Sequence, residues 1–200
     1  MEIRLIEPLG LGVLVADADP QSSSMLAKML SIQGYKISCI LSDPRELAAK
    51  VRALAPDVVV VNAGAFERQF LDQLEALASE ERRPTLMLSA GGAPEDIKDA
   101  VATGVSAYLL VGLNGNRVRA GIDLAIANFS NVAYLRQELD EARAALEARK
   151  IIERAKGIVM RQKGLDEDSA YRLLRGRAME RGVRLAEIAR MVTETEDLLA

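Results

Sequence analysis

Apolar runs and helical segments alternate through the first half of this 200-residue chain, and this alternation limits the possible folds more than any other feature. Five apolar runs have the length and composition of strands, at 11–17, 35–40, 57–61, 85–90 and 106–111. Helical spacing of apolar residues fills the intervals at 20–34, 44–55, 67–80 and 94–104. Strands that alternate with helices predict an α/β domain built on a five-stranded parallel sheet. The handedness of crossover connections favours the flavodoxin-like strand order 2-1-3-4-5.

The second half of the chain has helical patterns throughout and contains no proline after Pro94. A run of 35 residues from Ile122 to Lys156 has neither glycine nor proline, which indicates a coiled coil or a long connecting helix. Apolar residues spaced alternately by three and four form a seam for a partner helix, namely Val132, Leu135, Leu139, Ala142 and Leu146. The seam covers barely two heptads, so packing of one helix on its own domain is the alternative. The length of the helix favours a dimer.

Glycines divide the rest of the chain into shorter helices. Gly164 is expected to end the long helix, and Gly182 to separate a helix at 166–181 from another at 184–199. Ten apolar residues are expected to form a three-helix core, namely Ile158, Met160, Ala170, Leu173, Leu174, Ala178, Met179, Leu185, Ile188 and Met191. The predicted organisation has three parts, a sheet domain, a coiled-coil linker helix and a small three-helix bundle, at 1–121, 122–148 and 149–200.

The composition excludes several kinds of chemistry. The chain has no histidine, which removes the usual general base and the commonest metal ligand, and Cys39 is its only thiol. No apolar run approaches the roughly 20 residues that span a bilayer, and the first ten residues lack the pattern of a signal peptide. We therefore expect a cytoplasmic protein that binds neither metal nor cofactor, has no membrane partner and is not an enzyme.

Charge is distributed unevenly along the chain. Residues 1–148 hold 14 Lys and Arg against 20 Asp and Glu, whereas residues 149–190 hold 12 against 6. An acidic body followed by a basic helical segment is typical of a protein that binds nucleic acid through that segment. A solvated helical surface is the alternative interpretation.

Four motifs in the first half resemble those of response-regulator receiver domains, and the resemblance covers roughly residues 10–125. They read VLVADADP, PDVVVVN, LMLSA and GVSAYLLVG. In that family an acidic pair holds Mg²⁺, an aspartate accepts phosphate, and a hydroxyl residue and a lysine complete the site. The matching positions in this chain are Asp17, Ala18, Asn62, Ser89 and Val111.

Three of these five positions have lost the group that the receiver reaction needs. Ala18 replaces the second acid, Asn62 the phosphoacceptor and Val111 the lysine. Because phosphoryl transfer needs a metal and a cation around the developing negative oxygens, the resemblance implies a pseudo-receiver that keeps the fold without the phosphorylation switch. The alternatives are weak cation binding by Asp17 with Asp19, and phosphate transfer to Ser89, and both lack the electrostatic partners of such chemistry.

The stretch from 149 to 192 is similar to an ANTAR domain, the three-helix RNA-binding module of transcription antiterminators. Its most specific parts are AKGIVM, AYRLLR and LAEIA. The order receiver, long helix and ANTAR domain resembles NasT-type nitrate-assimilation regulators, with the AmiR group of amidase operons as a near relative. The residues expected to contact RNA are Lys156, Arg161, Lys163, Tyr171, Arg172, Arg175 and Arg177. Packing of Tyr171 in the small core is the alternative for that residue.

The resemblance implies a homodimer that binds paired hexaloop hairpins in a leader mRNA and so prevents a terminator hairpin. It also implies control by a periplasmic-binding-protein-like sensor that sequesters the regulator, for nitrate or nitrite in one group and for amides in the other. Two other classes stay open. One is a DNA-binding response regulator whose last two helices form a helix-turn-helix, and the other is an adaptor with an inert helical tail.

Overall fold

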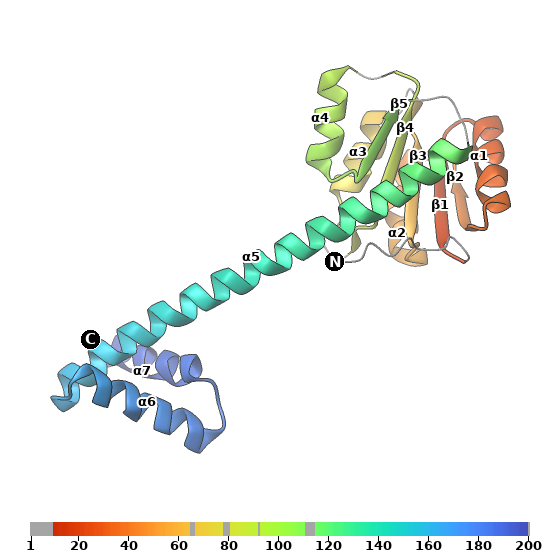
Figure 1. Ribbon diagram of the computed structural model, residues 1–200. Helices are drawn as coiled ribbons and strands as arrows, with labels where there is room; N and C mark the ends of the chain where they lie inside the picture. Colours follow the sequence, from red (N-terminus) through yellow and green to blue (C-terminus); the bar gives the residue numbers. More distant parts are fainter. Residues whose placement is uncertain (1–9, 65–66, 78–80, 92, 111–114, 200) are drawn as a thin grey trace. The chain divides into compact units, whose positions relative to one another are not determined.

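The computed structural model describes residues 10–64, 67–77, 81–91, 93–110 and 115–199 (Figure 1). The chain divides into two compact units, at residues 1–133 and 134–200. Within the described ranges, every helix is too short or too polar to cross a membrane.

Five parallel strands form the sheet of the first unit, in the order β2-β1-β3-β4-β5 (Figure 1). Their bounds are Gly12–Asp17 for β1, Lys36–Leu41 for β2, Val58–Asn62 for β3, Thr85–Ser89 for β4 and Ala107–Leu110 for β5. Each strand agrees with its predicted run to within one residue at either end. The predicted α/β fold and its flavodoxin-like strand order are confirmed.

Helices connect the strands in the predicted intervals. They are α1 Pro20–Ile32, the 3₁₀ turn η1 Pro44–Glu46, α2 Leu47–Leu54, α3 Glu67–Glu75 and α4 Pro94–Thr103. Asp19 caps α1, because its carboxylate accepts hydrogen bonds from the backbone N–H groups of Gln21 and Ser22. The helix predicted at 44–55 begins instead as the 3₁₀ turn, which Asp43 caps through the backbone N–H of Arg45.

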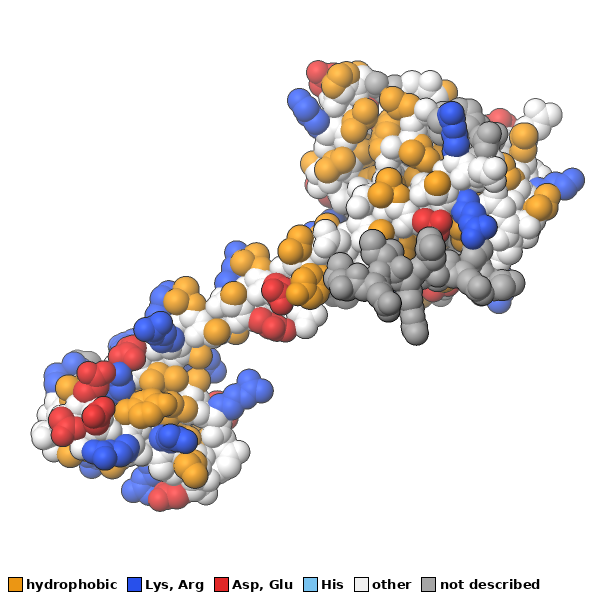
Figure 2. Space-filling view, in the orientation of Figure 1, with side chains coloured by type: hydrophobic (Ala, Val, Ile, Leu, Met, Phe, Trp, Pro, Cys, Tyr) orange, Lys and Arg blue, Asp and Glu red, His pale blue; other side chains and the backbone are white. Residues whose placement is uncertain are grey.

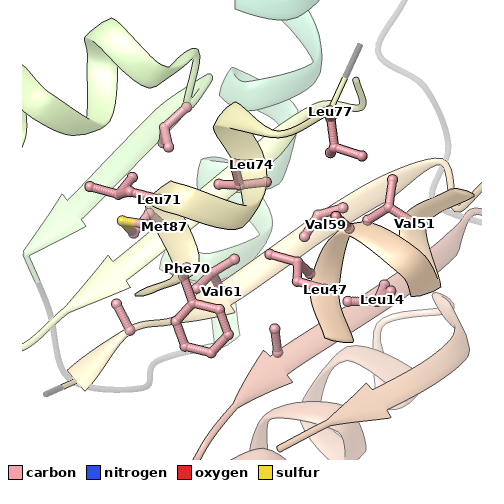
Figure 3. Close-up of a cluster of buried hydrophobic side chains, with 14 of the residues drawn as sticks. Leu14, Leu47, Val51, Val59, Val61, Phe70, Leu71, Leu74, Leu77 and Met87 are labelled. Atoms are coloured by element: carbon pink, nitrogen blue, oxygen red, sulfur yellow. The ribbon is translucent and has the colours of Figure 1, made fainter. Parts of the chain in front are cut away.

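The valines of β3 explain why this strand is apolar along its whole length. Val59 and Val61 lie in a cluster with Leu47 of α2 and Phe70 of α3 on one face of the sheet (Figure 3). Val58 and Val60 lie in a second cluster on the other face, together with Leu26 and Leu30 of α1 and with Val118, Ile122 and Ala125. Because β3 is covered on both faces, its four valines are buried whichever way they point.

Helix α5 runs without interruption from Gly115 to Lys163. It therefore begins before the Gly- and Pro-free run that indicated it, and it continues through Gly157. The last glycine before that run, Gly121, lies against the sheet, where an added Cβ would come within 2.5 Å of a methyl carbon of Leu109. The start of the predicted linker range 122–148 is part of the sheet core, because Ile122 is fully buried there.

The second unit is a small helical domain built from the last part of α5, α6 Glu167–Arg181 and α7 Leu185–Leu199. Its core contains Ala155 and Val159 of α5, Ala170, Leu174 and Ala178 of α6, and Ile188 and Ala189 of α7. Asp166 caps α6 through the backbone N–H of Ser169, and Gly182 ends that helix in the left-handed region, as the sequence indicated.

Two of the ten residues predicted for this core are exposed, so the prediction was wrong for them. Met179 is 73% exposed and Met191 is 46% exposed. The inward side of α6 repeats every four residues through Ala170, Leu174 and Ala178, which turns Met179 outward.

Candidate nucleic-acid interface and the receiver-like edge

The carboxyl ends of β1 and β3 bring Asp17 and Asn62 side by side, since the two residues are partners in the strand register. The Asn62 Nδ2 group donates one hydrogen bond to Asp17 Oδ2 at 2.8 Å and another to Ser22 Oγ at 2.8 Å. The other carboxylate oxygen of Asp17 accepts from the backbone N–H of Asp19 at 2.9 Å. Asp17 is only 3% exposed, so these donors replace the water that its charge has lost.

Asp19 is occupied as the cap of α1, with one carboxylate oxygen 3.1 Å from the backbone nitrogen of Gln21 and the other 3.3 Å from that of Ser22. Ala18 lies between the two acids and lines a groove outside the strand ends. Across the described residues, no group of three or more Asp, Glu, Cys or His side chains is arranged to hold a metal ion. The amide of Asn62 thus supplies a hydrogen-bond donor to the buried Asp17 carboxylate.

Ser89, another residue of the predicted receiver site, is also hydrogen-bonded within the protein. Ser89 is buried, and its hydroxyl donates to the backbone carbonyl of Gly91. Val111 lies outside the described residues. On β5, where Tyr108 is the register partner of Met87, the Tyr108 hydroxyl donates to Glu67 Oε1 at 2.9 Å, and burial raises the pKa of this phenol. Sequence reasoning missed Ser22, Glu67 and Tyr108, because only the folded chain brings these partners together.

Lys156 is the one predicted RNA contact that the fold buries, at 8% exposure. Its Nζ donates to Glu153 Oε2 at 2.8 Å and to Glu167 Oε1 at 2.7 Å, which ties α5 to the first turn of α6. Hydrogen bonds to both carboxylates raise the pKa of Lys156, and the hydrogen bond from Lys156 lowers the pKa of Glu167. We therefore assign Lys156 to the stability of the helical unit and omit it from the proposed RNA surface.

Tyr171, Arg172 and Arg175 form an exposed face of α6, which we call the α6 face. Tyr171 is 40% exposed, so the alternative of a core tyrosine is excluded. Arg175 lies one helical turn after Tyr171, and Arg172 is held loosely by a 3.3 Å hydrogen bond to Ser169 Oγ. Exposed guanidinium groups beside an exposed ring combine the two contacts that single-stranded RNA offers, phosphates and unstacked bases.

The other predicted RNA contacts lie elsewhere on the helical unit. Arg161 pairs with Glu196 of α7 at 3.1 Å, and Lys163 is exposed in the last turn of α5. Arg177 points to a different side of α6 from Arg175, pairs with Glu180 at 2.8 Å and lines a groove against α7. Figure 2 shows Lys and Arg side chains beside apolar ones on the visible side of this unit.

Known proteins resemble each of the two units of the chain. Residues 140–192 match the family model of the ANTAR domain. The first unit is similar to the receiver domain of a modulated diguanylate cyclase from Desulfovibrio desulfuricans G20, with a TM-score of 0.52 at 20% identity over 60% of this chain and 96% of that one. It is also similar to the chemotaxis response regulator CheY4 of Vibrio cholerae, with a TM-score of 0.51 at 21% identity over 57% of this chain and 98% of that one. The chain therefore combines a receiver-like fold with an ANTAR domain.

Two relatives are known as regulators. The transcriptional regulatory protein PdtaR of Mycobacterium tuberculosis is 28% identical over 183 residues, which cover 92% of this chain and 89% of PdtaR. The nitrate regulatory protein of Klebsiella oxytoca is 39% identical over 61 residues, which cover 30% of this chain and 15% of that protein. The match to the first relative extends over both units, and the match to the second covers a shorter segment.

Proposed function

We propose that the chain is an RNA-binding regulator of transcription antitermination. The observation that carries the proposal is the exposed α6 face, because it lies inside the ANTAR match at 140–192. On this proposal Arg172 and Arg175 bind loop phosphates of a leader-RNA hairpin, while Tyr171 stacks on an unpaired base. Holding the hairpin keeps the competing terminator from forming.

We propose further that the active form is a homodimer joined through α5. The seam residues Val132, Leu135, Leu139 and Leu146 are 45%, 56%, 48% and 54% exposed, and Ala142 is also exposed. Leaving four large apolar side chains on one stripe of a helix is unfavourable in water, and a second copy of the same stripe would cover them. Two RNA-binding domains on one dimer suit a pair of hairpins, because the second contact gains from effective concentration.

Charges beside the seam favour a parallel dimer. Glu138 and Arg143 are exposed and have no ion-pair partner within the described chain. They are five residues apart, the spacing at which flanking residues of two parallel helices meet, so each dimer would form the Glu138–Arg143 pair twice. An antiparallel arrangement would bring Arg136 of one helix towards Arg143 of the other.

We propose that a partner protein, not phosphorylation, controls the regulator. Asn62 cannot form an acyl phosphate, and its amide already bonds Asp17 and Ser22. The expected partner is a periplasmic-binding-protein-like sensor that sequesters the chain by mass action until a small molecule releases it. The Klebsiella oxytoca relative favours nitrate or nitrite assimilation as the setting. An amidase operon is the alternative.

The decisive experiment compares RNA with DNA. A pool of tandem stem–loop RNAs with randomised hexaloops is selected against the full-length chain, and the winning RNA is compared with duplex DNA at one salt concentration. We expect the RNA to bind at least about tenfold more tightly. Preference for duplex DNA would overturn the proposal in favour of a helix-turn-helix regulator, and failure to bind either would favour a protein-interaction adaptor.

The dimer is tested by two sets of variants in sedimentation equilibrium. Leu139→Asp should abolish association, because it places two carboxylates in the seam. Glu138→Arg should weaken the parallel dimer by about fivefold to tenfold, and adding Arg143→Glu should restore it, since each exposed pair contributes up to about 1 kcal/mol. In an antiparallel dimer Glu138 would not face Arg143, so adding Arg143→Glu would not rescue the first change.

A further inference from the structure

A groove lies on the helical unit between the last turn of α5, the second half of α6 and α7. Its volume is about 400 Å³, and it is lined by Gln162, Arg177, Arg181, Ile188, Met191, Val192, Thr195 and Glu196. Most of these residues lie outside the sequence-predicted RNA contacts, and the groove is separate from the α6 face. A volume of this size falls within the range of sites that hold a small flat molecule.

The groove has an apolar floor. Ile188 is 5% exposed and belongs to the core, Val192 is packed against that core, and Met191 remains 46% exposed at the groove. Met191 thus leaves part of a flexible and polarisable side chain open to the groove. Such a side chain is suited to cover the face of a ring that enters the groove.

The rim of the groove carries polar groups that the fold does not use fully. Arg181 Nη1 lies 3.6 Å from the sulfur of Met191, a weak acceptor. Arg177 bonds only Glu180 within the described chain, an exposed neighbour on its own helix. Because a guanidinium has five N–H donors, both arginines retain donors for a ligand. The Gln162 amide has no hydrogen-bond partner among the described residues, so both its donor and its acceptor are free.

These features match the chemistry of one nucleotide. A base offers flat faces for the apolar floor and an edge of donors and acceptors for an amide, and its phosphate offers charge for two guanidinium groups. We infer that the groove binds a single unpaired base of the hairpin loop, with Gln162 at the base edge and Arg177 and Arg181 at the flanking phosphate. This inference rests on the proposed RNA-binding function. It adds a second base contact to that of Tyr171, on a different side of α6.

A base in duplex nucleic acid would not fit the groove, because paired and stacked bases expose no face that could lie on Ile188 and Met191. The groove therefore predicts that recognition depends on a loop base and not on the stem. It also predicts that the contribution of one loop position is lost when the apolar floor is removed.

The test combines substitutions in the protein with removal of single bases from the RNA loop. The hexaloop RNA selected with the wild-type chain is made with a single abasic nucleotide at each loop position in turn, and binding is measured for wild type, Met191→Ala and Met179→Ala. Met179 is also exposed and on the helical unit, but it does not line the groove, so it provides the matched control. Thermal unfolding checks that each variant is folded, and Met191→Leu supplies a variant that keeps the apolar floor.

For wild type and Met179→Ala, we expect one loop position, besides the one that stacks on Tyr171, at which loss of the base weakens binding by about thirtyfold. For Met191→Ala, the same abasic RNA should lose only about threefold, while Met191→Leu should behave like wild type. If loss of the base weakened binding equally for Met191→Ala and Met179→Ala at every loop position, the proposal that the groove binds a base would be overturned. Failure of wild type to bind the selected RNA would instead overturn the RNA-binding proposal, so the two failures are distinct.

Discussion

The carboxyl edge of the sheet and the surface of the helical unit both carry polar side chains that could support chemistry or binding, but they use them in opposite ways. At the sheet edge, Asn62 donates hydrogen bonds to Asp17 and Ser22, and Asp17 is buried. On the α6 face, Tyr171 is exposed and Arg175 makes no ion pair within the described chain. Polar groups that satisfy one another hold a fold together, whereas polar groups left to solvent are available to a ligand.

At the sheet edge, the residues that form the fold differ from those that the receiver reaction would need. The valines of β3 pack into clusters on both faces of the sheet, and this packing does not depend on the polar residue at the end of the strand. Asn62, which ends β3, can therefore differ from the receiver family's aspartate without loss of the sheet. This unit keeps a receiver-like scaffold, and the proposed RNA surface lies on the helical unit.

Among the substitutions that test this comparison, those on the α6 face should have the largest effect, on RNA affinity. Arg172→Glu combined with Arg175→Glu should weaken hairpin binding by about 100-fold and reduce its salt dependence, because two cation–phosphate contacts become repulsions. Filter binding across a salt series measures both. Lys28→Glu with Lys98→Glu changes the net charge equally on the sheet unit, and both lysines are exposed. Equal losses in the two double variants would show that net charge alone, and not this face, drives binding.

A smaller effect is expected at the sheet edge. Asn62→Asp should lower the free energy of unfolding by about 1–3 kcal/mol, because it removes a donor from the buried Asp17 and adds a second carboxylate beside it. Chemical denaturation measures this change, with Asn62→Ala as the variant that removes the donor without adding charge.

The same Asn62→Asp variant should not take phosphate from acetyl phosphate in the presence of Mg²⁺, because Ala18 still supplies no second acid. Intact-protein mass spectrometry reads out the modification. A stoichiometric phosphate on the variant would contradict our account of this edge.

The smallest effect concerns the ion pair that holds Lys156 away from the proposed RNA surface. Glu167 has its pKa below the ordinary value of 4.5 because Lys156 donates a hydrogen bond to it. A carboxylate with a lowered pKa stabilises the fold at pH values above its unfolded pKa and loses that contribution as the pH falls through the folded one. Glu167→Gln should therefore destabilise the helical unit near neutral pH, and the difference from wild type should vanish in acid. Urea denaturation at a series of pH values tests this, and a difference that persists at the acid end would count against the ion pair.

The sheet could be predicted from sequence because it depends on patterns along the chain. Apolar runs such as the valines of β3 identify strands, and the alternation with helices favours one strand order. The neighbourhood of Asp17 and Asn62 is predictable as well, since both end strands that are adjacent in that order. The hydrogen bond from Asn62 to the Ser22 hydroxyl could not be predicted, because it depends on the direction in which the first turn of α1 runs from the sheet edge.

The helical unit was harder to predict, because side-chain burial there depends on how three helices pack together. Glu153 is visible in the sequence as a partner for Lys156 three residues away, but Glu167 reaches the same ammonium only after the turn into α6. The exposure of Met179 and Met191 likewise depends on which neighbours take the inward positions. The groove at Met191 has no counterpart in any local pattern of the sequence.

The amide at Asn62 has a consequence for timing. An acyl phosphate records a stimulus for as long as the bond survives, so a receiver that carries one has a memory set by hydrolysis. An amide that is hydrogen-bonded to Asp17 and Ser22 stores nothing. If a partner protein controls the chain, as proposed, its effect would last only as long as the contact itself.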